Sequence, residues 1–152
     1  MDLRPCRREI ESLGGSIAWV SNCVRGGIGV SFAGVKLHDQ DLCALRETLP
    51  RVVWLDLSES PITDAGLMEL RSARCLEALS IDGTRITAAG LLGLRSLPKL
   101  VQIHAADTAV AAEDVQRLRQ AGWTTEINVH RSGACCGWFP GIDAALMAGI
   151  MS

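Results

Sequence analysis

The stretches PITDAGLMEL (residues 61–70) and RITAAGLLGL (residues 85–94) are near copies of one another, 24 residues apart. Two further segments align with them at nearly the same spacing, IGVSFAGVKLHDQDLCAL from Ile28 and VQIHAADTAVAAEDVQRL from Val101. The segment TTEINVH (residues 124–130) begins a fifth copy. A repeat of about two dozen residues therefore decides the fold of this chain, because such repeats bury their apolar faces only by stacking on one another.

Each copy changes its hydrophobic period halfway along. The triplets LDL and LSI alternate in the period of two that is typical of a strand with one buried face. Ile62, Leu67 and Leu70 then follow at spacings of five and three, which favours a short helix. The repeat predicts strand, turn and helix in every unit, with Leu55, Leu79 and Ile103 forming one contiguous buried row.

The start of each predicted helix carries its own signals. Thr63 and Thr87 stand where a helix N-cap is expected, since their hydroxyls can accept a hydrogen bond from a first-turn amide, and Asp39 is a candidate for this role in the first unit. Gly66 and Gly90 occupy early helical positions, where glycine is disfavoured by about 1 kcal/mol relative to alanine. We infer that a side chain there would collide with the neighbouring unit; the alternative is a tolerated small residue.

The repeated phrases LDLSESPITDAGLMEL and LSIDGTRITAAGLLGL resemble the leucine-rich repeat, L-x-x-L-x-L-x-x-(N/T)-x-L. They are most similar to its bacterial 24-residue form, L-x-x-T-x-I-T-D-A-G-L, as in ribonuclease-inhibitor-like and GALA-like repeats. The resemblance covers roughly residues 7 to 130. It implies an α/β fold: a short right-handed leucine-rich-repeat solenoid, with a parallel β-sheet on the concave face and short helices on the convex face. The repeat serves many roles, so it implies no particular activity.

The repeats divide the chain into two parts. Residues 1–130 form the expected leucine-rich-repeat domain, with an N-terminal cap helix and strand at about 4–22 and repeats at about 28–130. Residues 131–152 are expected to be a C-terminal tail or cap. The N-terminal residues contain arginines but no following apolar stretch, which argues against a signal peptide and favours a cytoplasmic protein.

The composition favours a soluble domain without a strong electrostatic field. Of the 152 residues, 48% are hydrophobic and 21% are charged, and the formal net charge is −2. We therefore expect neither nucleic acid nor a membrane as a partner.

Six cysteines are present without any C-x-x-C spacing. The adjacent Cys135 and Cys136 are either a redox or soft-metal site or, more simply, structural residues.

Side chains that alternate with the buried ones are predicted to line the concave face, the usual recognition surface of such arrays. Trp54 is the best anchor candidate, because tryptophan is common among binding hot spots; the alternative is packing at the rim. Six strands would give a face of only about 300 Å², whereas a standard interface buries about 800 Å² per partner. A peptide, a loop or a weakly bound protein is the expected partner, contacted by Trp54, Asp56, Ser58, Ser80, Asp82, Gln102, His104 and Asn128.

A second set of polar residues is expected to be structural. Ser60, Thr84 and Thr108 follow the predicted strands at equivalent positions, where main-chain groups of adjacent units would otherwise be buried without partners. We expect their hydroxyls to form a ladder between units. Thr84→Val should therefore destabilise the protein more than Ser80→Ala does.

Two other functions remain open from the sequence. One is a structural or self-assembly role through the ends of the array or the C-terminal tail. The expected oligomeric state is a monomer or a weak homodimer. The other is a small metal or catalytic site on the concave face, formed by Asp56, Asp82, His104 and His130. We expect no enzyme and no cofactor, because no phosphate-binding loop, dinucleotide fingerprint, G-x-S-x-G or H-E-x-x-H motif is present and an open sheet does not exclude water.

Overall fold

The computed structural model describes residues 4–20 and 27–129 of the chain. They form an α/β structure with one six-stranded sheet and five short α-helices. The strands are β1 (Ser16–Val20), β2 (Ile28–Ser31), β3 (Val52–Asp56), β4 (Ala78–Ser80), β5 (Gln102–His104) and β6 (Glu126–Asn128). The helices are α1 (Arg4–Ser12), α2 (Asp39–Ala44), α3 (Asp64–Glu69), α4 (Ala88–Gly93) and α5 (Ala112–Gln120).

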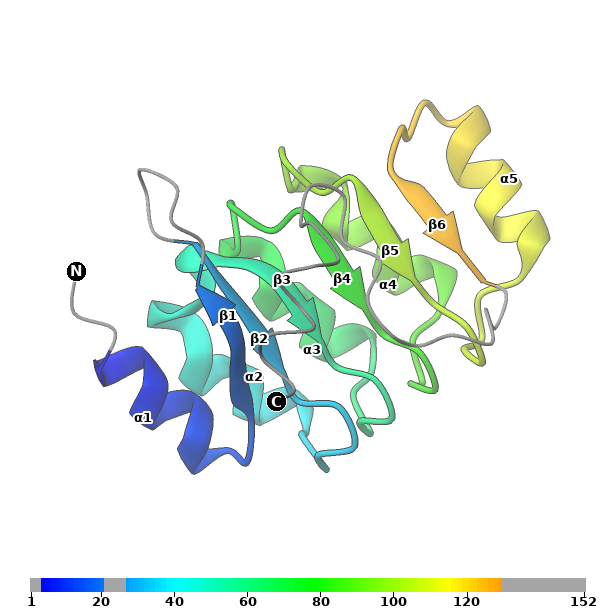
Figure 1. The fold of residues 1–152 in the computed structure, drawn as a ribbon. Helices are drawn as coiled ribbons and strands as arrows, with labels where there is room; N and C mark the ends of the chain where they lie inside the picture. The colour runs from blue at the N-terminus through cyan, green and yellow to red at the C-terminus, as the bar shows by residue number, and fades with distance from the viewer. Residues whose placement is uncertain (1–3, 21–26, 130–152) are drawn as a thin grey trace, which may run out of the picture.

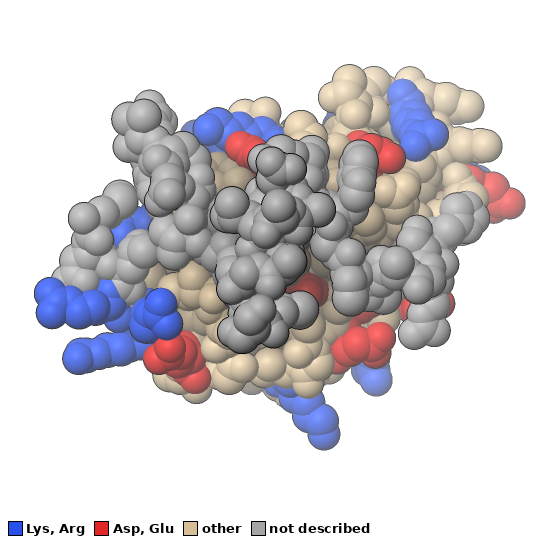
Figure 2. Space-filling model, viewed as in Figure 1, with Lys and Arg blue, Asp and Glu red and all other residues tan. Residues whose placement is uncertain are grey.

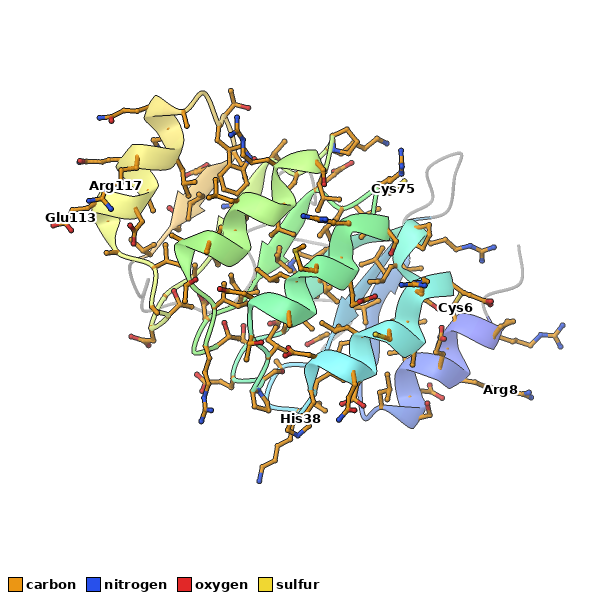
Figure 3. The ribbon with its side chains drawn as sticks, turned by 180° about the vertical axis from the view of Figure 1, so that it is seen from behind. Cys6, Arg8, His38, Cys75, Glu113 and Arg117 are labelled. Carbon is orange, nitrogen blue, oxygen red and sulfur yellow. The ribbon has the colours of Figure 1, made fainter. Side chains whose placement is uncertain are left out.

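The strands lie in the sheet in the order in which they occur along the chain, β1-β2-β3-β4-β5-β6. Each of the strands β2 to β5 is followed by a helix, and these helices lie side by side behind the sheet (Figure 1). The view from behind shows the same helical layer in front of the strands (Figure 3). We call a strand with its following turn and helix a unit, and the sheet face away from α2–α4 the sheet front.

The predicted buried row is confirmed. Leu55 of β3 pairs in register with Leu79 of β4, and Leu79 pairs with Ile103 of β5. All three side chains are fully buried between the sheet and the helices. The row extends at both ends, to Val30 of β2 and Ile127 of β6. One apolar core therefore runs through all the units.

One strand departs from the predicted all-parallel sheet. β1 pairs with β2 in the antiparallel direction, while all the other neighbouring strands are parallel. Only seven residues separate Val20 from Ile28. A parallel connection needs a crossover of about a dozen residues or more, so this connection is too short for it.

The helix starts are held by contacts between units that the repeat pattern does not predict. Thr63 and Thr87 are N-caps, as predicted, and each hydroxyl accepts from the amide two residues later at 3.3 Å. The carboxylate of Asp39 accepts from the N–H and the hydroxyl of Thr63 at 2.8 and 2.6 Å. Asp64 does the same for Thr87, again at 2.8 and 2.6 Å. An aspartate of one unit therefore caps the helix of the next.

The prediction that Asp39 caps its own helix is wrong. The N-cap of α2 is His38, whose N–H donates to the carboxylate of Asp41 at 2.8 Å. At the other end of the array, the N–H of Ala111 donates in the same way to Asp114 of α5 at 3.1 Å. In α2 and α5, the N–H of the N-cap residue thus donates to an aspartate of the same helix. In α3 and α4, it donates to an aspartate of the preceding unit.

Gly66 and Gly90 leave space for these aspartates. A Cβ on Gly66 would lie 2.5 Å from Oδ1 of Asp39, and one on Gly90 would lie 2.2 Å from Oδ1 of Asp64. Both distances are far below a van der Waals contact. The inference that a side chain would collide with the neighbouring unit is confirmed.

No helix within the described residues combines the length and the hydrophobicity that crossing a membrane requires. The predicted C-terminal tail, residues 131–152, lies outside the described part of the chain, as do Cys135, Cys136 and His130.

Candidate binding face on the sheet front

Two rows of side chains cross the sheet front. The parallel pairing of β3 with β4, of β4 with β5 and of β5 with β6 fixes both rows, because residues in register lie next to one another across the sheet. Ser58 and Asp82 follow two residues after the ends of β3 and β4. The first row consists of Trp54, Ala78, Gln102 and Glu126, and the second of Asp56, Ser80, His104 and Asn128.

Hydrogen bonds join the serines around Asp56 into one network. The hydroxyl of Ser58 donates to Oδ1 of Asp56 at 2.6 Å, and the N–H of Ser58 donates to the same oxygen at 3.0 Å. Ser31 of β2 donates to the other carboxylate oxygen at 3.4 Å. The Ser58 hydroxyl also lies 2.9 Å from that of Ser80 on β4. Asp56 is thus held by donors of its own chain, and its main effect is to fix three neighbouring strands and their turns.

Asp82 is held at one oxygen. The N–H of Ala106 donates to its Oδ1 at 2.7 Å, which ties the turn after β4 to the turn after β5. The side chains of His104 and Asn128 are only partly exposed, and no hydrogen bond from either to another described residue is present. These two side chains therefore offer polar groups to a ligand without first breaking an internal contact.

The first row is less open than the sequence predicts. Gln102 is only 5% exposed and Ala78 is 9% exposed, whereas Trp54 is half-buried and Glu126 is exposed. Alternation along a strand fixes the side of the sheet on which a residue lies. Alternation does not fix the exposed fraction of that residue. The predicted side of the sheet is therefore correct for Gln102, and its predicted exposure is wrong.

The expected ladder of hydroxyls between units is present at one position only. Ser60 donates to the carbonyl of Val35 in the preceding unit at 2.9 Å. Thr84 donates to the carbonyl of Ile81 at 2.6 Å, and Thr108 to that of Ala105 at 2.7 Å, both within their own turns. Thr84 and Thr108 therefore close the turn after their strands instead of joining neighbouring units.

Thr84→Val is still expected to destabilise the protein more than Ser80→Ala. Thr84 is buried, and its loss as a donor to Ile81 should lower the free energy of unfolding by about 1 kcal/mol. Ser80 is partly exposed, so water can replace its contact with Ser58, and a change within about 0.5 kcal/mol is expected. Thermal unfolding of the two variants measures the difference. Equal melting temperatures would contradict this role of Thr84.

The geometry gives little support to a metal or catalytic site on this face. Asp56 and His104 are separated by the strand that carries Ser80, which places them about 10 Å apart. Within the described residues, no group of three or more histidine, cysteine, aspartate or glutamate side chains is arranged to hold a metal ion. His130, the fourth candidate, lies outside these residues.

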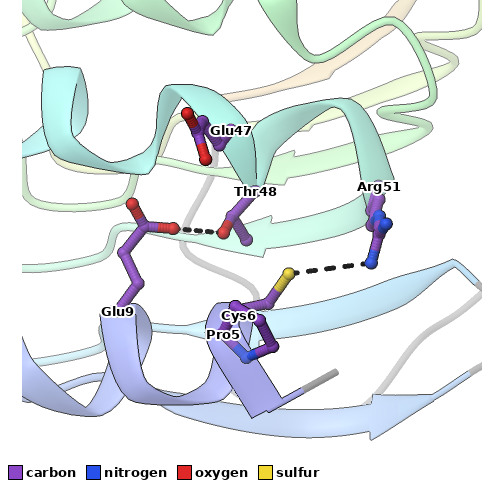
Figure 4. A pocket seen from close by; sticks show the side chains of 6 residues that line it. All are labelled: Pro5, Cys6, Glu9, Glu47, Thr48 and Arg51. Atoms are coloured by element: carbon purple, nitrogen blue, oxygen red, sulfur yellow. Dashed lines mark hydrogen bonds between the residues drawn. The ribbon is translucent and has the colours of Figure 1, made fainter. Parts of the chain in front are cut away.

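A separate open pocket of about 360 Å³ lies between α1 and the 3₁₀ turns after α2 (Figure 4). Thr48 donates to the carboxylate of Glu9, and Nη1 of Arg51 lies 3.9 Å from Sγ of the buried Cys6. These contacts fasten α1 to the first unit. The sequence predicted the cap helix but not the pocket, because its residues come from two segments about 40 positions apart. The lining consists of Pro5, Cys6, Glu9, Glu47, Thr48 and Arg51.

The charged side chains of the two rows on the sheet front are acidic. In the view of Figure 2, Lys and Arg side chains gather at the margins of the molecule, above all beside α1. The two rows contain two acidic residues and no lysine or arginine, and Asp82 adds a third carboxylate beside them. The described part of this face therefore favours basic over acidic ligands.

Neither a protein-family model nor a curated protein matches the sequence.

Proposed function

We propose that this chain is a short leucine-rich-repeat module whose sheet front, the concave face of a solenoid, binds a protein or peptide partner without catalysing a reaction. The repeated sequence phrase and the in-register pairing from β2 to β6 support the assignment to this repeat class. The function rests on one observation: side chains stand in two ordered rows, the second of them entirely polar, on the face that no helix of the described residues covers.

The size of the face sets the class of partner. Four paired positions in each row, about 4.8 Å apart, span only about 15 Å, and this is far smaller than a standard protein interface. An extended peptide or a single loop of a larger protein fits such a face. Half-buried Trp54 supplies the largest apolar contact, and His104 and Asn128 supply hydrogen-bonding groups.

Selection from a random peptide library displayed on phage tests the proposal. The full chain should enrich a family of related peptides, and the variant Trp54→Ala/His104→Ala should lose most of their binding. The variant Met68→Ala/Leu92→Ala is the matched control, because these side chains are 43% and 47% exposed on the helical layer. Circular dichroism verifies that both variants are folded.

Two results would contradict recognition by this face. One is a library that yields no enriched family with the wild-type chain. The other is a family whose binding is lost in the Met68/Leu92 variant and kept in the Trp54/His104 variant, which would assign binding to the helices.

A further inference from the structure

Gln102 differs from every other buried polar side chain in the described part of the protein. Five polar side chains are buried there, and four of them are hydrogen-bonded. Thr48 bonds to Glu9, and the other three bond to main-chain carbonyls. The carboxamide of Gln102, which is 5% exposed, bonds to no described residue. The four buried polar side chains that are hydrogen-bonded are Thr48, Ser60, Thr84 and Thr125.

An unpaired buried amide is unfavourable, and such groups are rare in folded proteins. The equivalent position is occupied by Trp54 on β3 and by Ala78 on β4, so the site in the unit accepts apolar side chains. Nothing in the packing of the units therefore requires glutamine here. An uncompensated polar group on the face proposed for recognition points to a partner that compensates it.

We propose that Gln102 pairs with a main-chain amide of an extended peptide that carries a basic side chain. This inference rests on the proposed function of the sheet front. A glutamine carboxamide offers one acceptor oxygen and two donor hydrogens, which complement the C=O and N–H of a peptide main chain. Because so little of Gln102 is exposed, the group that reaches it is narrow, as main-chain amides are.

The surroundings of Gln102 specify the charge of this peptide. Glu126 is its neighbour in the first row and is exposed. Asp82 lies at the opposite end of the strands, about 13 Å from the level of Gln102, and keeps one carboxylate oxygen outside its bond to Ala106. The rows contain no lysine or arginine that would neutralise these acids. A lysine or arginine of the peptide is therefore attracted to Glu126, beside Gln102.

Gln102→Leu separates binding from folding, because the two effects have opposite signs. Replacing an unpaired buried amide with an apolar group of similar size should raise the melting temperature, by about 2–4 °C for a chain of this length. The same change should weaken, by about tenfold or more, the binding of a peptide selected with the wild-type chain. Gln116→Leu on α5, where the glutamine is exposed, is the matched control and should change peptide affinity less than twofold.

Each outcome decides between the two proposals. If the wild-type chain enriches no peptide, the proposed function fails and this inference fails with it. If it enriches peptides that Gln102→Leu binds equally well, or peptides rich in Asp and Glu, recognition stands and the role of Gln102 is overturned. A lower melting temperature of Gln102→Leu would also overturn it, because Gln102 would then be paired in the free protein.

Discussion

Leu79→Ala is expected to lower the free energy of unfolding by about 2–5 kcal/mol. Leu79 is fully buried at the centre of the apolar row, between Leu55 and Ile103. Alanine would leave a cavity between three units, and stacked units cannot close it without losing their register. Since domains of this size are stable by only about 5–15 kcal/mol, the loss is a large part of the total.

Urea unfolding followed by circular dichroism measures this effect, with Leu92→Ala as the control. Leu92 lies on α4 and is 47% exposed, so the same chemical change there should alter stability by less than about 1 kcal/mol. Similar losses in the two variants would show that the row around Leu79 is not the shared core of the units.

The register of the sheet could be predicted from the sequence for a physical reason. A strand places its side chains on alternate faces, so the pairing is fixed once one face must be buried. Val30, Leu55, Leu79 and Ile103 recur at a nearly constant spacing, and only one pairing brings all of them together. The same reasoning put the two rows on the sheet front.

The capping between units could not be predicted in the same way. An aspartate at the first position of a helix is favourable in any helix, because it lies near the positive end of the dipole. Nothing local indicates that Asp39 and Asp64 bond to the next unit. A signal is present in hindsight: the third helical position is aspartate in the two outer helices and glycine in the two inner ones, in the order Asp41, Gly66, Gly90 and Asp114.

The candidate site was predicted only in outline. Its rows follow from alternation, whereas the exposure and the pairing of each side chain depend on contacts in three dimensions. The bonds of Asp56 to Ser31 and Ser58 and the burial of Gln102 belong to this second class. Exposure and hydrogen-bond pairing together distinguish the side chains that hold the turns from the side chains that are available to a ligand.

Gly90→Ala is expected to lower the free energy of unfolding by about 1–3 kcal/mol, although alanine is the better helix former by about 1 kcal/mol. The new Cβ would lie 2.2 Å from Oδ1 and 3.0 Å from Cβ of Asp64, so rotation of the carboxylate alone does not relieve the clash. Asp64 must give up its bonds to the N–H and hydroxyl of Thr87. Bonds to a charged group contribute about 1.5–3 kcal/mol, which outweighs the gain in propensity.

A double-mutant cycle with Asp64→Ala isolates this contact. Once the carboxylate is removed, the methyl group has room, and Gly90→Ala should become neutral or stabilising by up to about 1 kcal/mol. Gly93→Ala in the same helix is the control, because its Cβ would meet only the ends of two long side chains, Sδ of Met68 at 3.1 Å and Nη2 of Arg71 at 3.6 Å. If Gly90→Ala is equally harmful with and without Asp64, its cost is a property of the helix itself. In that case the glycine is not what lets one unit cap the next.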